Sequence, residues 1–182
     1  MSTENFGQPE KKGGIVQPIL IGAVAALIGG NVYQFVQQDK LRNELGLRAR
    51  VIEAGSGVGG TWYWNRYPGA RSDSDSYLYG FTFDEQLWRE WRWSERYPEQ
   101  REIRAYLEHV AERYDLLRDI TFDTRVAALH FDEPTGTWTA HTDGGERLVA
   151  RYAITAVGAL SAANTPDFPG ADTFRGASYH TG

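Results

Sequence analysis

Apolar positions follow two different periods along the chain, and each period predicts a different kind of element. Residues 100–114 carry apolar side chains three and four positions apart, which predicts an amphipathic helix. A second helix is predicted over residues 84–93, where Trp88 and Trp91 have helical spacing. Short apolar runs predict strands over residues 48–54, 120–131, 138–142, 146–150 and 152–156. This mixture of helices and strands indicates an α/β domain.

The later strands are separated by short turn signals. Gly136 lies between two of them, and residues 143–145 (Asp-Gly-Gly) lie between the next two. Such turns join neighbouring antiparallel strands. We therefore expect a small antiparallel sheet, after which the chain returns to the main sheet.

The first 44 residues differ in composition from the remainder. Residues 1–14 are polar and glycine-rich, which predicts a disordered tail. Residues 15–36 carry no charge and open an apolar segment, residues 15–44, whose role the sequence leaves open. Its length approaches the roughly 20 apolar residues of a membrane-spanning helix, although Pro18 and Asn31 interrupt it. The alternative is a buried strand and helix with residues 19–28 in the core.

Composition excludes several classes of function. The formal net charge is −5, and the basic residues are interspersed with acids, so we expect no nucleic-acid partner. The chain has no cysteine, which excludes disulfides and thiolate nucleophiles and agrees with a cytoplasmic protein, with membrane association through residues 15–36 as the alternative. The four histidines are far apart in sequence, so we predict no metal site.

Glu53 stands at the end of the predicted strand over residues 48–54 and before a glycine-rich loop, GSGVGG. In a dinucleotide-binding fold, an acid at the end of the second strand accepts hydrogen bonds from the adenosine ribose. An acid in this place is more often a solvated strand end. Glu53 alone therefore does not decide the function.

The residues after Glu53 form an unusually dense group of aromatic, glycine and arginine residues. Residues 51–81 read VIEAGSGVGGTWYWNRYPGARSDSDSYLYGF. Because Trp, Tyr and Arg each need specific partners, we interpret this density as more than core packing, with an aromatic structural loop as the alternative. The segment resembles the Baeyer-Villiger monooxygenases, in which a strand that ends in an acidic residue leads to GGxWYWNRYPGAR and then to an Asp.

This resemblance implies an incomplete Rossmann-like FAD-binding domain over residues 45–182, with the small antiparallel sheet as an insertion and with FAD and NADP as cofactors. It implies FAD contacts by Glu53, Thr61, Trp62, Tyr63, Trp64, Asp73, Tyr79 and Val126. It also implies that Arg71, Ser72 and Asp73 face the nicotinamide cofactor. Asp73 would take a catalytic part by positioning an arginine that this sequence does not contain.

Residues 152–182 supply a second resemblance to the same family. Residues 152–158 (YAITAVG) resemble the strand and turn that follow the small sheet in flavin oxygenases, and LSAANTPDFPG resembles the linker after it. Phe174, Gly176 and His180 resemble the opening of the family fingerprint FxGxxxHxxxW. A functional linker role for His180 and a plain loop role both remain open.

One family feature is missing from the sequence. The family begins with a strand and G-x-G-x-x-G, whose bare amides hold the FAD pyrophosphate. Here the turn is expected near Gly30, but Val32 and Phe35 occupy the second and third glycine places. Side chains there block close approach of the backbone to phosphate, so we predict poor FAD affinity.

The resemblance as a whole implies a fragment of an FAD- and NADPH-dependent monooxygenase that inserts oxygen next to a ketone carbonyl or oxidises a sulfide. The second glycine-rich turn and the catalytic arginine are absent from these residues. We therefore expect no turnover by this chain alone. The alternative is a non-catalytic protein, either membrane-tethered or the product of a truncated or fused reading frame.

Overall fold

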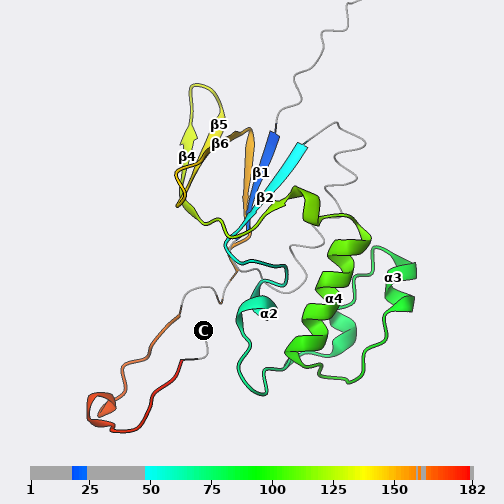
Figure 1. Ribbon diagram of the computed structural model, residues 1–182, viewed down its shortest axis with the longest axis vertical. Helices are drawn as coiled ribbons and strands as arrows, with labels where there is room; N and C mark the ends of the chain where they lie inside the picture. The colour runs from blue at the N-terminus through cyan, green and yellow to red at the C-terminus, as the bar shows by residue number, and fades with distance from the viewer. Residues whose placement is uncertain (1–17, 24–47, 159, 161–162, 181–182) are drawn as a thin grey trace, which may run out of the picture.

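The computed structural model describes residues 18–23, 48–158, 160 and 163–180. This part of the chain holds two β-sheets and a group of helices (Figure 1). The larger sheet has four parallel strands in the order β3-β2-β1-β7. These strands are β1 (Pro18–Ala23), β2 (Arg48–Glu53), β3 (Ile120–Thr121) and β7 (Tyr152–Thr155). The prediction of a mixed α/β architecture is confirmed.

β1 occupies part of the apolar segment whose role the sequence left open. It pairs with β2 on one side, from Pro18 opposite Arg48 to Ala23 opposite Glu53, and with β7 on the other. A strand inside a sheet favours the interpretation as strand and helix over the membrane anchor for these six residues. No helix in the described ranges combines the length and the apolar character needed to cross a bilayer. The tail of residues 1–14, the rest of the apolar segment and the expected glycine turn near Gly30 lie outside the described residues.

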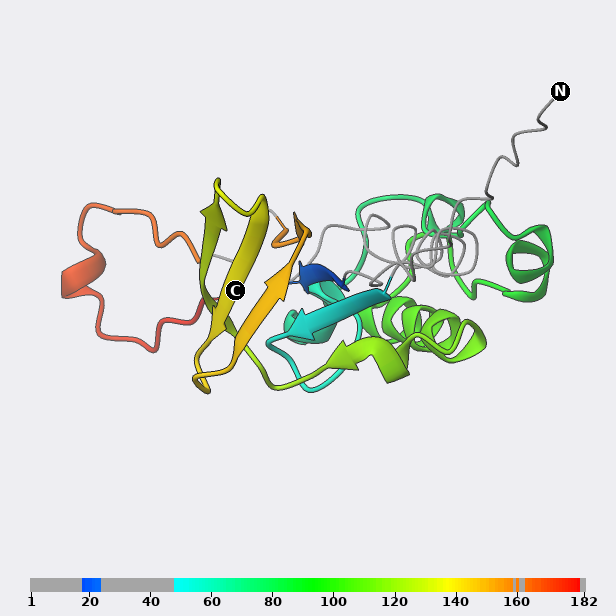
Figure 2. The same cartoon turned by 90° about the horizontal axis from the view of Figure 1, so that it is seen from above.

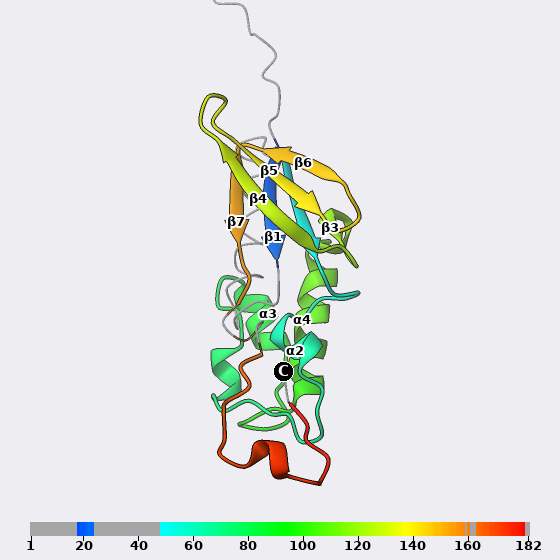
Figure 3. The ribbon, with the colours of Figure 1, turned by 90° about the vertical axis from the view of Figure 1, so that its left-hand side faces the viewer.

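The smaller sheet is antiparallel, as predicted. It consists of β4 (Val126–Asp132), β5 (Thr137–Thr142) and β6 (Arg147–Ala150) in that order. Its strands cross obliquely over β7 and β1 in Figure 3. The single strand predicted over residues 120–131 is wrong, because the chain breaks after β3. Asp123 takes a positive φ of 51°, and the chain then leaves the parallel sheet for the smaller one.

Adjacent residues of β2 explain how the layers are held together. Successive side chains of a strand point to opposite faces of its sheet. Val51 packs with Ala111 and Leu116 at the end of α4 (Gln100–Arg113), whereas Ile52 packs with Ala140 and Ala150 of the small sheet. The parallel sheet therefore lies between α4 and the small sheet, as Figure 2 shows.

The helices cover the other end of the molecule. The long predicted helix is confirmed as α4, which buries Ile103, Tyr106 and Val110 on one face. The second predicted helix is shorter than expected: α3 covers Glu85–Glu90 because Trp91 is already extended, at φ −73° and ψ 126°. The remaining helical elements are α2 (Thr61–Trp64), η1 (Ser76–Leu78), η2 (Leu117–Asp119) and η3 (Ala171–Thr173).

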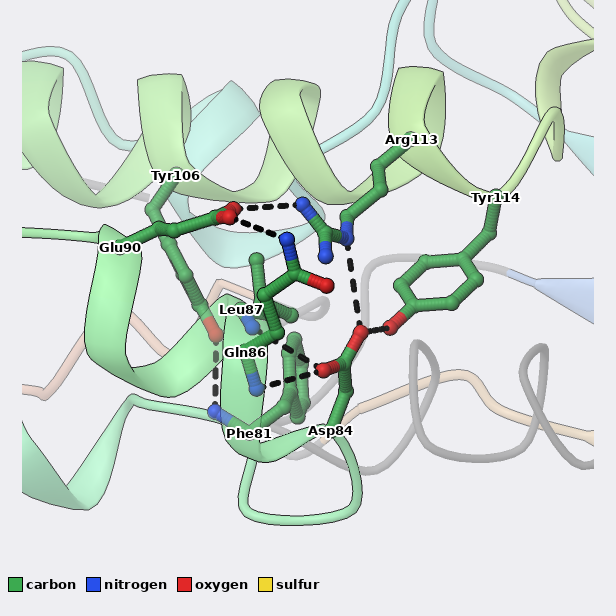
Figure 4. Close-up of polar contacts among 8 residues, drawn as sticks. All are labelled: Phe81, Asp84, Gln86, Leu87, Glu90, Tyr106, Arg113 and Tyr114. Atoms are coloured by element: carbon green, nitrogen blue, oxygen red, sulfur yellow. Dashed lines mark hydrogen bonds and ion pairs between the residues drawn. The ribbon is translucent and has the colours of Figure 1, made fainter.

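A polar network joins α3 to α4 (Figure 4). The Asp84 carboxylate caps α3 by accepting hydrogen bonds from the amides of Gln86 and Leu87, at 2.8 and 3.0 Å. The guanidinium of Arg113 lies 3.4 Å from Asp84 Oδ2 and 2.7 Å from Glu90 Oε2. The network fixes the orientation of the short helix against the long one.

Candidate functional site

Glu53 lies at the carboxyl end of β2, and its side chain is buried, with 8% exposed. Its Oε1 accepts a hydrogen bond of 2.7 Å from the Gly55 amide. Burial raises the pKa of the Glu53 carboxyl, although the amides of Gly55 and Ala54 and the charge of Arg125 act in the opposite direction. A buried carboxylate at a strand end is an acceptor held in one place.

The loop after β2 passes very close to Tyr63 of α2. A Cβ placed on Gly55 would lie 2.8 Å from Tyr63 Cε1, and one on Gly57 would lie 3.2 Å from Tyr63 Cε2. Gly59 has a φ of +129°, which side-chain-bearing residues rarely adopt. The glycines are therefore required by the packing of the loop on the tyrosine ring, and the predicted turn-rich loop is confirmed.

The hydroxyl of Tyr63 completes this contact. It accepts a hydrogen bond of 3.2 Å from the Ser56 amide and lies 2.6 Å from Ser56 Oγ. The guanidinium carbons of Arg66 and Arg104 lie 5.0 and 5.2 Å from the centre of its ring. The Ser56 hydrogen bonds, followed by the two arginine charges, lower the pKa of the Tyr63 phenol.

Trp62 belongs to a second group of residues on the other side of α2. Its ring meets that of Tyr79 edge to face at 5.9 Å, and both pack on Ile103 of α4. Gln100 Nε2 donates a hydrogen bond to the Trp62 carbonyl. Trp62 Nε1 and Tyr79 Oη are both buried, and the side chains of Ser72 and Trp62 act on the Tyr79 hydroxyl to lower its pKa against the larger effect of burial. Trp62, Tyr79 and Ser72 therefore form one buried cluster beside α2.

Residues 70–73 run beside the segment that leads into α4. The Ser72 amide donates to the Pro98 carbonyl at 3.0 Å, and Ser72 Oγ donates to the Ser74 carbonyl at 2.8 Å. The guanidinium of Arg71 forms ion pairs with Glu95 and, at 2.9 Å, with Glu99. Arg71 thus anchors this segment with both of its terminal nitrogens.

Asp73 follows directly and is exposed to solvent. Its Oδ1 accepts a hydrogen bond of 3.3 Å from the Ser74 hydroxyl. Its negative charge acts on nearby Tyr79, whose pKa is raised chiefly by burial. Asp73 therefore borders the Trp62 and Tyr79 group.

The structure brings most of the residues implied by the resemblance to the two sides of α2. Glu53 and Tyr63 share the glycine loop on one side, and Trp62, Ser72, Asp73 and Tyr79 lie on the other. Val126 packs half-buried against Ile52 at the start of β4. Trp64 is 45% exposed, whereas Trp62 and Tyr63 are buried. Trp62 and Tyr63 are covered by α4 and the glycine loop, and our interpretation that this aromatic density is more than core packing stays a prediction.

The sequence analysis did not single out three residues that support this region, Ser56, Gln100 and Arg104. Gln100 and Arg104 stand one helical turn apart on α4 and contact α2 through Trp62 and Tyr63. The i, i+4 spacing of Gln100 and Arg104 beside the apolar face of α4 was visible in the sequence. Their contacts with α2 could not be predicted, because α2 has only four residues and therefore no apolar period of its own.

The carboxyl-terminal residues extend away from the helices as a long loop (Figure 1). Phe174, Gly176 and His180 are all exposed. A ring nitrogen of His180 lies 3.2 Å from the Asn164 carbonyl oxygen, so the two ends of the loop are held together. This contact leaves both interpretations of His180 open.

No family model matches the chain. Individual relatives do match it. The chain is 48% identical over 158 residues to a Baeyer-Villiger monooxygenase of Pseudooceanicola batsensis and 46% identical over 157 residues to an acetone monooxygenase of Gordonia sp.. These alignments include 87% and 86% of the chain, but the chain spans only 29% of the length of either relative.

Solved structures give the same result. An oxidized steroid monooxygenase bound to NADP matches with a TM-score of 0.71 and 49% identity, over 84% of this chain and 28% of that one. A closed cyclohexanone monooxygenase matches with a TM-score of 0.76 and 42% identity, over 91% of this chain and 30% of that one. The fold of the chain is thus similar to that of part of these monooxygenases. More particularly, the chain is homologous to part of the Baeyer-Villiger monooxygenases.

Proposed function

We propose that this chain supplies the adenosine-binding end of the FAD site in a Baeyer-Villiger-type monooxygenase that uses FAD and NADPH. The single observation that carries the proposal is the buried Glu53 carboxylate at the carboxyl end of β2, next to β1 in a parallel sheet. In Rossmann-like folds this is the place of the acid that accepts hydrogen bonds from the ribose hydroxyls.

The strand order supports the Rossmann-like part of the proposal. The order β3-β2-β1-β7 corresponds to the order 3-2-1-4 that begins the sheet of dinucleotide-binding folds. In such sheets, ligands bind outside the carboxyl ends of the strands. β2 delivers Glu53 to that edge, and the chain then enters the glycine loop on the same edge.

The side chains around α2 fit an FAD molecule in their chemistry. The Glu53 carboxylate is suited to the ribose hydroxyls, and Val126 offers an apolar contact for the adenine. Trp62 and Tyr79 meet edge to face on the other side of α2, where the resemblance implies the flavin. We place Thr61 and Trp64 along the same cofactor because they belong to the same short helix as Trp62.

The chemistry would be that of the family. Relatives include acetone and cyclohexanone monooxygenases, which supports a small ketone as substrate, while a sulfide remains the alternative. Bound FAD would supply the oxygen-activating chemistry that converts a ketone to an ester or lactone. Asp73 would orient a cationic side chain from the rest of the enzyme, since opposite charges hold one another in place.

Arg71, Ser72 and Asp73 would face the nicotinamide cofactor. In this structure Arg71 is occupied by Glu95 and Glu99, both on the surface. Exposed ion pairs of this kind contribute little free energy, so Arg71 can exchange a carboxylate for a phosphate at small cost. Ser72 is buried and would act by holding its neighbours in position.

FAD binding to the purified chain tests the proposal. We expect weak but measurable quenching of flavin fluorescence, and at least a tenfold weaker Kd in Glu53→Ala. Glu133→Ala, in the exposed turn between β4 and β5, is the matched control and should leave the Kd unchanged. Equal affinities for the wild type and Glu53→Ala would contradict the assignment of Glu53.

Turnover is tested separately. We expect no ketone-dependent NADPH oxidation by this chain with added FAD, because it spans only 29% of the relatives it matches. Ketone-dependent oxidation above the rate with FAD alone would contradict this expectation. A chain that binds FAD without turnover is the expected result.

A further inference from the structure

Tyr63 connects three parts of the structure that are separate in sequence. Its ring lies against Gly55 and Gly57 of the loop after β2, and its hydroxyl contacts both the amide and the hydroxyl of Ser56. Arg104 reaches the same ring from α4. Three successive loop residues are thus held by one side chain.

The contact with Gly55 continues to Glu53. The Gly55 amide donates its hydrogen bond to Glu53 Oε1 at 2.7 Å. A Cβ on Gly55 would lie 2.8 Å from Tyr63 Cε1 and 3.2 Å from Glu53 Oε1. The ring and the carboxylate therefore both pack closely against Gly55. A shift of the ring would therefore move the Gly55 amide and, with it, the carboxylate.

The ring itself is held by two cations. Arg66 follows α2 in sequence, and Arg104 is kept in place on α4 by an ion pair of 2.8 Å with Glu108. Their guanidinium carbons lie 5.0 and 5.2 Å from the ring centre, within the range of attractive cation–π contacts. The tyrosine is thereby fixed before any ligand arrives, which is the condition for a preorganised site.

We propose that Tyr63 is a positioning residue: it holds Gly55 and Ser56 so that Glu53 presents its carboxylate to the ribose of a bound adenine nucleotide. It acts through Gly55 and Glu53 and does not itself touch the flavin. This assignment differs from the direct contact that the family resemblance implies for Tyr63, and its nucleotide part rests on the proposed function.

Hydrogen exchange of the loop amides tests the proposal without any nucleotide. Tyr63→Phe keeps the ring but removes the hydroxyl. We expect the Gly55 amide, which does not contact that hydroxyl, to exchange about fivefold faster, as for the loss of one ordinary hydrogen bond. Ser56→Ala removes only the Oγ contact and should give a smaller change of the same sign, so it provides the test if Tyr63→Phe does not fold.

Tyr114→Phe is the matched control. It also removes a tyrosine hydroxyl that bonds a partner, Asp84, but in the network between α3 and α4. It should lower stability without changing exchange at Gly55. A Gly55 exchange rate that is the same in Tyr63→Phe and Tyr114→Phe would overturn the proposal.

A second measurement separates positioning from general stabilisation. ADP and 2′,3′-dideoxy-ADP compete with FAD, and only ADP offers ribose hydroxyls to Glu53. We expect the wild type and Tyr114→Phe to prefer ADP by about tenfold, and Tyr63→Phe to lose most of that preference. Full retention of the preference in Tyr63→Phe would overturn the proposal. Absence of any preference in the wild type would instead refute the ribose contact of the proposed function, while faster Gly55 exchange would still support the role of Tyr63 in the loop.

Discussion

The phenol of Tyr114, the residue after α4, donates a hydrogen bond to the Asp84 carboxylate that caps the start of α3. Burial and the nearby carboxylate raise the pKa of Tyr114 to about 12, so this phenol remains a donor at neutral pH. Figure 4 shows Arg113 beside the same carboxylate. The Asp84 carboxylate therefore links the start of α3 to the end of α4.

Replacement of Asp84 by Ala should lower the free energy of unfolding by about 2–3 kcal/mol, since it removes both a helix cap and a charged acceptor. Asp84→Asn keeps an oxygen for the cap and should lose about half as much. Urea denaturation followed by circular dichroism measures both. A loss below about 0.5 kcal/mol in Asp84→Ala would show that the network does not stabilise the fold.

Replacement of Glu53 by Gln should stabilise the chain at neutral pH. Burial raises the pKa of Glu53 above its ordinary value of 4.5, so the ionised form costs stability in the folded state. The destabilising contribution of Glu53 therefore decreases as pH falls through the raised pKa toward 4.5, and the advantage of Gln disappears over the same window. Thermal unfolding at several pH values checks this, and a Gln variant that is less stable than the wild type at pH 7 would contradict it.

Tyr106→Phe should cost about 1–3 kcal/mol. Tyr106 is fully buried, and its hydroxyl accepts a hydrogen bond of 2.8 Å from the Phe81 amide, which would be left without this partner. Tyr152→Phe, at a tyrosine that is 51% exposed, is the control and should change stability by less than about 0.5 kcal/mol. Chemical denaturation of the two variants side by side distinguishes them.

Gly55→Ala should destabilise the chain by about 1–3 kcal/mol, because its Cβ would meet the Tyr63 ring at 2.8 Å. Gly144→Ala is the matched control. Its Cβ would meet only Thr142 Oγ1, at 3.8 Å, so its melting temperature should remain close to that of the wild type. Equal melting temperatures for the two variants would contradict this prediction, because they would show that the loop after β2 rearranges to accommodate the added methyl group at little cost.

Elements with a clear period were predictable from the sequence, and elements defined by long-range contacts were not. β2 and α4 follow their apolar periods and lie where they were predicted. The break between β3 and β4 depends on hydrogen bonds from the Asp123 and Thr124 amides to the carbonyls of Gly55 and Glu53, about 70 residues earlier. No local pattern reveals such a partner.

The candidate site shows the same division. Glu53 was identifiable because it ends an apolar strand before a glycine loop. The burial of Trp62 and Tyr63 could not be predicted from the sequence, because the helix that covers them, α4, follows some forty residues later. The roles of the individual residues toward FAD and NADP stay predictions.

β7 borders the parallel sheet on the side away from β2, and among the described strands it pairs only with β1. Tyr152 and Ile154 on this strand are 51% and 37% exposed. An apolar strand with an open edge is a template for edge-to-edge association with another copy. We therefore expect this chain to self-associate more as its concentration rises. Ile154→Lys, which places a charge on this edge strand, should reduce that association.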